Sequence, residues 1–72
     1  MKIIGYTAGT FDMLHAGHLN LLKNAKSMCN YLVVGVSTDE SAQKKGKKTV
    51  MPFAHRIDLV RSLRYVDSVI PQ

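Results

Sequence analysis

The 72-residue sequence contains no tryptophan, one cysteine, two prolines and only five acidic residues. The single cysteine, Cys29, excludes an internal disulfide framework and a cysteine-only zinc site, so we expect a reduced, cytoplasmic location. The apolar runs are far shorter than the roughly 18 residues that a membrane-spanning helix needs. Residues 1–7 also lack the apolar core of a signal peptide. We therefore expect neither a membrane span nor export.

Basic residues outnumber acidic residues by ten to five, which gives a formal net charge of +5 at pH 7. This charge suits an anionic partner such as a nucleotide, a phosphate ester or a nucleic acid, although many small proteins are basic for solubility alone. The sequence has no aromatic platform, helix-turn-helix pattern or zinc finger. We therefore expect no nucleic-acid partner.

The first half of the chain alternates between strand and helix patterns. The β-branched and aromatic content of residues 2–8 predicts a strand, and the continuous apolar run of residues 31–36 predicts a strand buried on both faces. Apolar residues at helical spacing predict a helix between them over residues 16–29. Asn30 is predicted to end this helix as a left-handed cap.

The second half continues the same alternation. Residues 37–40 close the second strand, and residues 42–50 form a lysine-rich connection. Pro52 is typical of a first helical position and precedes a second amphipathic helix over residues 53–63. Residues 66–71 are predicted to be a third short strand.

Strands that alternate with helices predict an α/β fold made of βαβ units, with right-handed crossovers and a parallel sheet. Repeats, linkers and low-complexity tracts are absent, so we expect residues 1–72 to belong to a single domain. Three strands and two helices cover one face of such a sheet well and the other face poorly. We therefore expect either further chain in the natural protein or a second copy, that is, a homodimer.

The most informative segment is Gly-Thr-Phe-Asp-Met-Leu-His-Ala-Gly-His, residues 9–18, at the turn from the first strand into the first helix. Ligands of open parallel sheets bind at the carboxyl ends of strands, and a helix start there accepts phosphate. Gly9 and Gly17 allow tight turns and close approach of the backbone to a ligand. His15 and His18 are three residues apart and can project to one side, where their rings can donate hydrogen bonds to phosphate oxygens.

Simpler interpretations of this histidine pair remain open. A histidine near a helix start is commonly a polar cap or a surface residue. The pair could also form half of a metal site, but no further Cys or His lies nearby in the sequence to complete tetrahedral zinc.

The whole segment resembles the signature of the HxGH nucleotidyltransferase superfamily and, within it, of the cytidylyltransferases. The similarity continues through residues 31–40, the lysine-rich connection, residues 52–56 and residues 64–71. It corresponds to the N-terminal half of these enzymes, and the glycerol-3-phosphate cytidylyltransferases are the most similar subfamily. The resemblance implies a Rossmann-like domain, present here in an incomplete form, that transfers CMP from CTP to a small phosphorylated alcohol. It also implies release of pyrophosphate and a Mg²⁺ ion that accompanies the triphosphate.

The resemblance also implies roles for individual residues. The backbone of Thr10 and Phe11 would cradle the nucleotide phosphates, and Asp12 would lie beside the triphosphate and its metal. His15 and His18 would stabilise the transferring α-phosphate.

Further roles are implied for the basic residues that follow. A lysine of the connection, Lys45 or Lys47, would clamp the phosphates, although a solvated run of charge is the simpler interpretation. Arg56 and Arg64 would lie near the substrate phosphate, and Arg56 could equally be a surface residue. Asp39 ends the second strand, where dinucleotide-binding folds place a ribose-binding acid, but a capping role is at least as well supported.

The chain departs from the family pattern in one respect. The second half of these enzymes carries an arginine followed by an Ile/Thr-Ser-Thr stretch that grips the β- and γ-phosphates, and this chain contains nothing similar. Two alternatives therefore stay open, an adenylyl-type transferase and a nucleotide-binding module without turnover.

Overall fold

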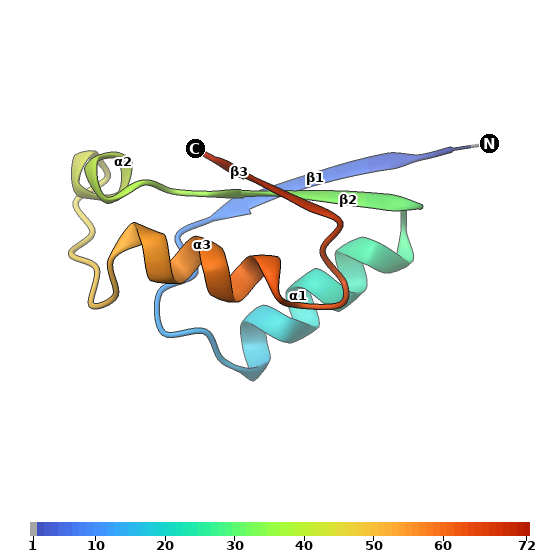
Figure 1. Ribbon diagram of the computed structural model, residues 1–72, viewed down its shortest axis with the longest axis horizontal. Coiled ribbons are helices and arrows are strands. Elements are labelled where there is room, and N and C mark those ends of the chain that lie inside the picture. Colours follow the sequence, from blue (N-terminus) through green and yellow to red (C-terminus); the bar gives the residue numbers. More distant parts are fainter. Residues whose placement is uncertain (1) are drawn as a thin grey trace.

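The computed structural model describes residues 2–72, and within them it contains three strands and three helices. In chain order the elements are β1 (Ile4–Gly9), α1 (Ala16–Ser27), β2 (Tyr31–Val36), α2 (Asp39–Lys44), α3 (Phe53–Arg61) and β3 (Ser68–Pro71). The strands form one parallel sheet in the order β1-β2-β3 (Figure 1). The predicted Rossmann-like α/β fold is confirmed. None of the helices in residues 2–72 has both the length and the apolar character to cross a membrane.

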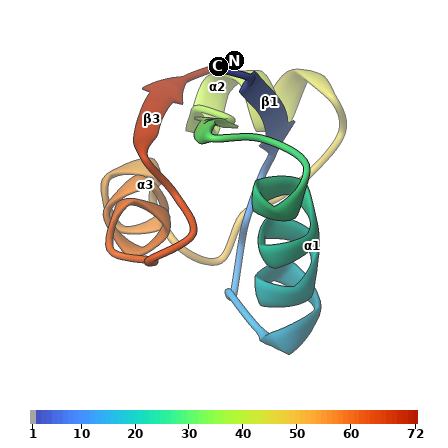
Figure 2. The same cartoon turned by 90° about the vertical axis from the view of Figure 1, so that its right-hand side faces the viewer.

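Both long helices cover the same face of the sheet, as Figure 2 shows for α1 and α3. This arrangement is expected when successive βαβ crossovers are right-handed. The core lies between the helices and the sheet, where Leu22 of α1, Val34 of β2 and Val60 of α3 are fully buried. The predicted poorly covered face is also present, because Ile4 and Tyr6 of β1 remain 65% and 56% exposed.

The helix α2 is absent from the sequence-based prediction, which treated residues 37–50 as a closing turn and a connection. The Thr38 side chain caps α2 by accepting a hydrogen bond from the amide of Ser41 at 3.0 Å. Within α2, Ala42 is the buried residue. Six residues are too few to display a helical repeat, so only the capping threonine and the two acidic residues after it signalled this helix.

The predicted left-handed cap at Asn30 is wrong. Helix α1 ends at Ser27, and its C-cap residue, Met28, has a φ of −100°. Within residues 2–72, a positive φ at a non-glycine residue occurs only at Phe11 and Met13. The Asn30 side chain accepts a hydrogen bond from the amide of Ile3 at 2.8 Å, and its own amide donates to the Ile3 carbonyl at 2.8 Å. Asn30 therefore fastens the entry of β2 to the entry of β1 instead of turning the chain.

The predicted boundaries differ from the observed ones by small amounts. Strand β1 begins at Ile4, two residues after the predicted start, and β3 begins at Ser68, also two residues after the prediction. Pro52 is the residue that precedes α3, not its first helical residue. Such shifts are expected, because pairing partners and cap bonds set the ends of elements more than local sequence does.

Substitution of Leu22 by Ala tests the core between α1 and the sheet. We expect the free energy of unfolding to fall by about 2–5 kcal/mol, because a fully buried leucine loses both its transfer free energy and its packing. Urea denaturation measures this change. Leu59→Ala is the matched control, since Leu59 of α3 is exposed and should change stability little. Equal losses for the two variants would contradict the described core.

Candidate functional site

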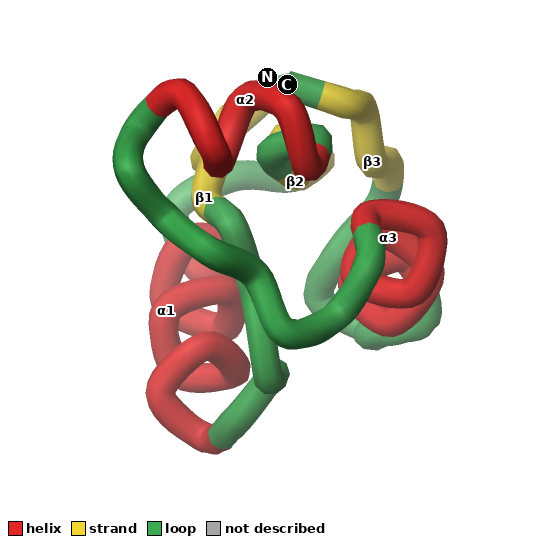
Figure 3. The backbone as a smooth tube through the Cα atoms, turned by 90° about the vertical axis from the view of Figure 1, so that its left-hand side faces the viewer, coloured by secondary structure: helices red, strands yellow, loops and turns green. Residues whose placement is uncertain are grey.

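A cavity of about 460 Å³, here called the first cavity, opens at the carboxyl end of β1. Figure 3 shows the lysine loop, residues 45–52, running from α2 across the carboxyl ends of the strands to α3. The loop forms one wall and the turn after β1 forms another. The lining residues are Ala8, Gly9, Thr10, Phe11, Asp12, His18, Leu21, Lys47, Lys48 and Thr49. The cavity therefore occupies the edge of the sheet where ligands of parallel sheets bind.

The turn after β1 is held in an uncommon backbone conformation. Phe11 and Met13 have φ values of 53° and 54°, a left-handed region that costs energy for side chains with a Cβ. The Phe11 side chain is buried in the core, and its ring lies 5.6 Å, centroid to centroid, from the ring of His18. Burial of Phe11 thus fixes the turn and places an aromatic support against His18.

His15 and His18 cap α1 through reciprocal hydrogen bonds. His15 Nδ1 accepts from the amide of Gly17 at 3.0 Å, and His18 Nδ1 accepts from the amide of His15 at 3.1 Å. This is a capping box in which histidines take the places commonly held by Ser or Thr and by Glu or Gln. The polar-cap interpretation of His15 is therefore confirmed, but it uses only one nitrogen of each ring.

The capping bonds fix the tautomer of both imidazoles. A nitrogen that accepts a hydrogen bond carries no proton, so each neutral ring holds its proton on Nε2 and can donate from there. The two rings lie with centroids 4.1 Å apart and planes tilted by 34°. A Cβ atom added to Gly17 would lie 2.7 Å from Cε1 of His15, which explains the need for glycine at that position.

Burial lowers the pKa of His18, and the neighbouring His15 lowers it further. The ring is therefore neutral at pH 7 and keeps the tautomer set by its capping bond. His18 lines the first cavity, whereas His15 is exposed and reaches the site only through its contact with His18. The structure thus brings the two predicted histidines together at the edge of the cavity.

Asp12 links the turn after β1 to the lysine loop. Its carboxylate accepts hydrogen bonds from the amides of Val50 at 2.7 Å and Met51 at 3.0 Å. The amides of Val50 and Met51 lower the pKa of Asp12, and the charge of Arg56 lowers it further. Asp12 therefore stays ionised and anchors the end of the lysine loop.

The residues around Asp12 fit a Mg²⁺ ion that arrives with a nucleotide. Asp12 is the one carboxylate in the lining of the first cavity, and Mg²⁺ is commonly held by one or two carboxylates together with substrate phosphates. Within residues 2–72, no group of three or more His, Cys, Asp or Glu side chains gathers as a metal site. The predicted metal contact of Asp12 stays a prediction.

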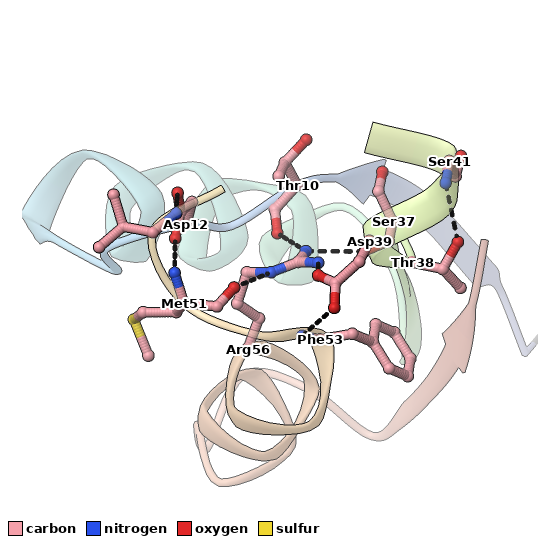
Figure 4. Close-up of polar contacts among 10 residues, drawn as sticks. Thr10, Asp12, Ser37, Thr38, Asp39, Ser41, Met51, Phe53 and Arg56 are labelled. Carbon is pink, nitrogen blue, oxygen red and sulfur yellow. Dashed lines mark hydrogen bonds and ion pairs between the residues drawn. The ribbon is translucent and has the colours of Figure 1, made fainter. Parts of the chain in front are cut away.

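Arg56 carries its guanidinium into the interior and is 0% exposed, so the alternative of a surface side chain is wrong. Figure 4 shows how the group joins separate segments of the chain. Its nitrogens donate to the carbonyls of Thr10 at 2.7 Å, Ser37 at 2.7 Å and Met51 at 2.9 Å, and to the carboxylate of Asp39 at 2.6 Å. Arg56 therefore ties the ends of β1 and β2 to the lysine loop. Its predicted contact with a substrate phosphate stays untested.

Asp39 serves two partners with its two carboxylate oxygens. One oxygen accepts from Arg56, and the other accepts from the amide of Phe53 at 3.2 Å, at the start of α3. Arg56 and then the Phe53 amide lower the pKa of Asp39. The capping interpretation is confirmed, and the ribose contact stays a prediction. The carboxylate remains reachable, because the side chain is 55% exposed.

The lysine loop supplies Lys47, as predicted, and also Lys48, which the sequence analysis did not select. Lys45 is the C-cap residue of α2 and is not among the residues that line the first cavity. The signal that distinguishes these lysines is their position after Gly46, whose φ of 77° redirects the chain toward the strand ends. Sequence alone could not show that redirection.

Arg64 is not brought to this site. It lies in the exposed turn between α3 and β3, with its guanidinium 5.5 Å from the ring centroid of Tyr65. That turn meets the amino end of β2, because the amide of Asp67 donates to the Leu32 carbonyl at 3.0 Å. The first cavity lies at the opposite, carboxyl end of the sheet.

Substitution of Arg56 by Ala tests the buried guanidinium. We expect the free energy of unfolding to fall by about 3 kcal/mol. This value is at the low end of the range for loss of one partner of a buried ion pair, because the Asp39 side chain is partly exposed to water. Arg61→Ala is the control, since its pair with Asp58 is exposed at 3.4 Å and should contribute about 0–1 kcal/mol. Urea denaturation of both variants checks this, and indistinguishable stabilities would contradict the role of Arg56.

The pH dependence of stability provides a second test. The folded state lowers the pKa of Asp12, Asp39 and Asp67 below the ordinary value of 3.8, so folding favours their ionised forms. This stabilisation is fully present at a pH above the pKa that these carboxyl groups have in the unfolded chain. It is lost as the pH falls through their lower pKa values in the folded protein. We expect chemical denaturation to show declining stability below about pH 4 and a weaker decline in Asp12→Asn. A flat profile would contradict the described carboxylate contacts.

Comparison with known proteins supplies the family. The family described as cytidylyltransferase-like matches residues 6–72. Glycerol-3-phosphate cytidylyltransferase of Bacillus subtilis (strain 168) is 49% identical over 71 residues, which are 99% of this chain and 54% of that protein. FAD synthase of Pyrococcus horikoshii is 40% identical over 70 residues, which are 96% of this chain and 47% of that protein.

A solved structure has a closely similar fold. The crystal structure of the lipopolysaccharide core biosynthesis protein from Thermoplasma volcanium GSS1 matches with a TM-score of 0.95 and 35% identity, over 100% of this chain and 59% of that chain. The chain spans about half the length of the curated relatives described above. Because the family match covers all but the first five residues, this chain belongs to the cytidylyltransferase-like family.

Proposed function

We propose that this chain is the nucleotide-binding part of a single transferase domain that moves CMP from CTP to a small phosphorylated alcohol, with release of pyrophosphate. The observation that carries the proposal is the pair of imidazoles at the edge of the first cavity, where His18 lines the cavity and His15 lies against His18. Both rings have Nδ1 fixed by a capping bond and a proton left on Nε2, and both stand at the start of α1. Two oriented donors beside a helix start suit a phosphate that gains negative charge.

In the proposed step, a phosphate oxygen of the acceptor attacks the α-phosphorus of CTP. The new bond joins that oxygen to phosphorus, and the bond from phosphorus to the bridging oxygen of pyrophosphate breaks, so pyrophosphate leaves with the electron pair. The acceptor is already an anion, so no base is needed to activate it. The Nε2–H groups of His15 and His18 would stabilise the charge that develops on the α-phosphate oxygens.

The lysine loop would supply positive charge that offsets the negative charge of the triphosphate. Lys47 and Lys48 line the first cavity together with His18 and would hold the phosphates of CTP. A Mg²⁺ ion bound with the triphosphate would neutralise part of its charge, and Asp12, the one carboxylate in the lining of the first cavity, would contact it. Gly9, Thr10 and Phe11 also line the cavity, and their backbone would approach the nucleotide closely.

The choice of CTP and of a phosphorylated alcohol is supported by the relative named glycerol-3-phosphate cytidylyltransferase. Adenylyl transfer is the second candidate, because a relative named FAD synthase shares 40% identity and FAD contains an adenine nucleotide. A homodimer and a cytoplasmic location remain predictions, as does the lack of a nucleic-acid partner. The exposed sheet face around Ile4 and Tyr6 is consistent with association.

Two histidine variants test the proposal with CTP, glycerol 3-phosphate and Mg²⁺, by calorimetry and by release of pyrophosphate. His15→Asn keeps a good helix cap but removes Nε2, and His18→Ala removes its ring. We expect each to lower the rate about 100-fold or more, the range for loss of one donor to a developing charge. His55→Ala is the control, because His55 is exposed on α3 and outside the site.

The outcomes separate the candidates. Unchanged turnover in both variants would contradict the roles of the histidines. Binding of CTP without product would support a binding module without turnover, and product from ATP but not from CTP would support the adenylyl alternative.

A further inference from the structure

The ring of Phe11 and the rings of the two histidines form a series of contacts that leads from the core to the surface. Phe11 is only 4% exposed, His18 is half-buried and His15 is exposed. The ring centroids of Phe11 and His18 lie 5.6 Å apart, and those of His18 and His15 lie 4.1 Å apart. His18 therefore lies between a ring that the core holds in place and a ring that faces water.

The capping bonds alone do not fix how the histidine rings are turned. Each ring is held at Nδ1 by one hydrogen bond, at 3.0 Å for His15 and at 3.1 Å for His18. A hydrogen bond at one nitrogen leaves the ring free to tilt about that atom, and this tilt moves Nε2 on the other side of the ring. A second ring packed against the imidazole removes the freedom, because close-packed side chains leave no space for the movement.

The position of the Phe11 ring is set by two unusual features of the turn after β1. The first is the φ of 53° at Phe11, in a region that side chains with a Cβ adopt only when the surrounding structure enforces it. The second is the missing side chain of Gly9, because a Cβ there would lie 3.1 Å from Cε2 and 3.3 Å from Cζ of Phe11. Both features place the ring under the turn, against the backbone of Gly9 and beside His18.

We infer that Phe11 is a positioning residue for the reaction, whose buried ring sets the orientation of His18 and, through His18, that of His15. With 4% of its surface exposed, the Phe11 side chain is nearly inaccessible to substrate, so it acts only through the histidines. The inference rests on the proposed function, which needs both Nε2–H groups aimed at one phosphate. It adds a residue that determines their aim.

The same packing affects the protonation of His18. Burial is the main cause of the lowered pKa of His18, and the neighbouring His15 is the second cause. A second proton on His18 would occupy Nδ1 and break the capping bond, so the site requires the neutral ring. Three other charged residues share the lining of the first cavity with His18, namely Asp12 from the turn after β1 and Lys47 and Lys48 from the lysine loop. Loss of the Phe11 ring should expose His18 to water and raise its pKa toward the ordinary value of 6.5.

Phe11→Leu tests the inference, because leucine keeps an apolar side chain in the core but removes the flat ring. We expect long-range ¹H–¹⁵N spectra of the free protein to show displaced Nε2 signals for His18 and His15, and a pH titration to show a higher pKa for His18. With CTP, glycerol 3-phosphate and Mg²⁺, we expect kcat to fall roughly 10- to 100-fold with little change in KM, as for donors that are misaimed in the transition state. The acid limb of the rate should move to higher pH.

Gly9→Ala moves the Phe11 ring without removing it, since the added Cβ would press on Cε2 and Cζ. We expect this variant to displace the Nε2 signal of His18 in the free protein. In the Phe11→Leu background the same change should have a much smaller effect, because leucine lacks both atoms. Such non-additivity is the mark of two residues that act through one contact.

Phe53→Leu is the matched control. Phe53 is the other phenylalanine of the chain, lies on α3 and packs against the core while partly buried. Its replacement should lower stability but leave the histidine signals and the pKa of His18 unchanged. The dispersion of the amide spectrum verifies that each variant is folded.

Two results would overturn the inference. The first is that Phe11→Leu loses stability as Phe53→Leu does while its histidine signals and the pKa of His18 match the wild type. The second is that Gly9→Ala displaces the His18 signal equally in both backgrounds. A wild-type chain whose Nε2 signals do not respond to CTP would instead contradict the proposed function, and the spectra of the free variants would still decide whether Phe11 orients the histidines.

Discussion

The guanidinium of Arg56 is a full positive charge with no access to water, and it persists there because three carbonyls and one carboxylate surround it. Burial of an unpaired charge costs several kcal/mol, so this arrangement is stable only while its partners stay in place. Those partners belong to the end of β1, the end of β2, the start of α2 and the lysine loop. One side chain of α3 therefore joins the turn after β1, the end of β2 and the lysine loop.

The remaining contacts refine that arrangement. Asp12 holds the far end of the lysine loop through the amides of Val50 and Met51, and Asp39 holds the start of α3. Between these anchors and α2, the loop is exposed and turns at Gly46, where the φ of 77° favours glycine. Lys47 and Lys48 thus lie on the exposed part of a loop that is anchored at both ends.

Much of this structure could be predicted from the sequence, and the reasons for success and failure are physical. The apolar run of residues 31–36 correctly predicted a strand, but its predicted burial on both faces is wrong, because both long helices cover one face and leave Tyr31 exposed and Val33 half-buried on the other (Figure 2). The apolar residues at helical spacing correctly predicted α1. The role of Asn30 in joining β1 to β2 could not be predicted, because its hydrogen-bond partner, Ile3, is 27 residues away in the sequence. Arg56 looks like any other basic residue of an amphipathic helix, and only the folded structure reveals its burial. The histidine pair was found from its spacing, but the capping bonds that fix its tautomers required coordinates.

Long-range ¹H–¹⁵N spectra of the histidine rings, recorded with and without CTP and Mg²⁺, test the central claim most directly. The described geometry predicts that His15 and His18 both carry their proton on Nε2 in the free protein, and that CTP shifts both Nε2 signals while both Nδ1 signals keep the character of acceptors. A proton on Nδ1 of either ring, or a response to CTP confined to one ring or absent from both, would contradict it.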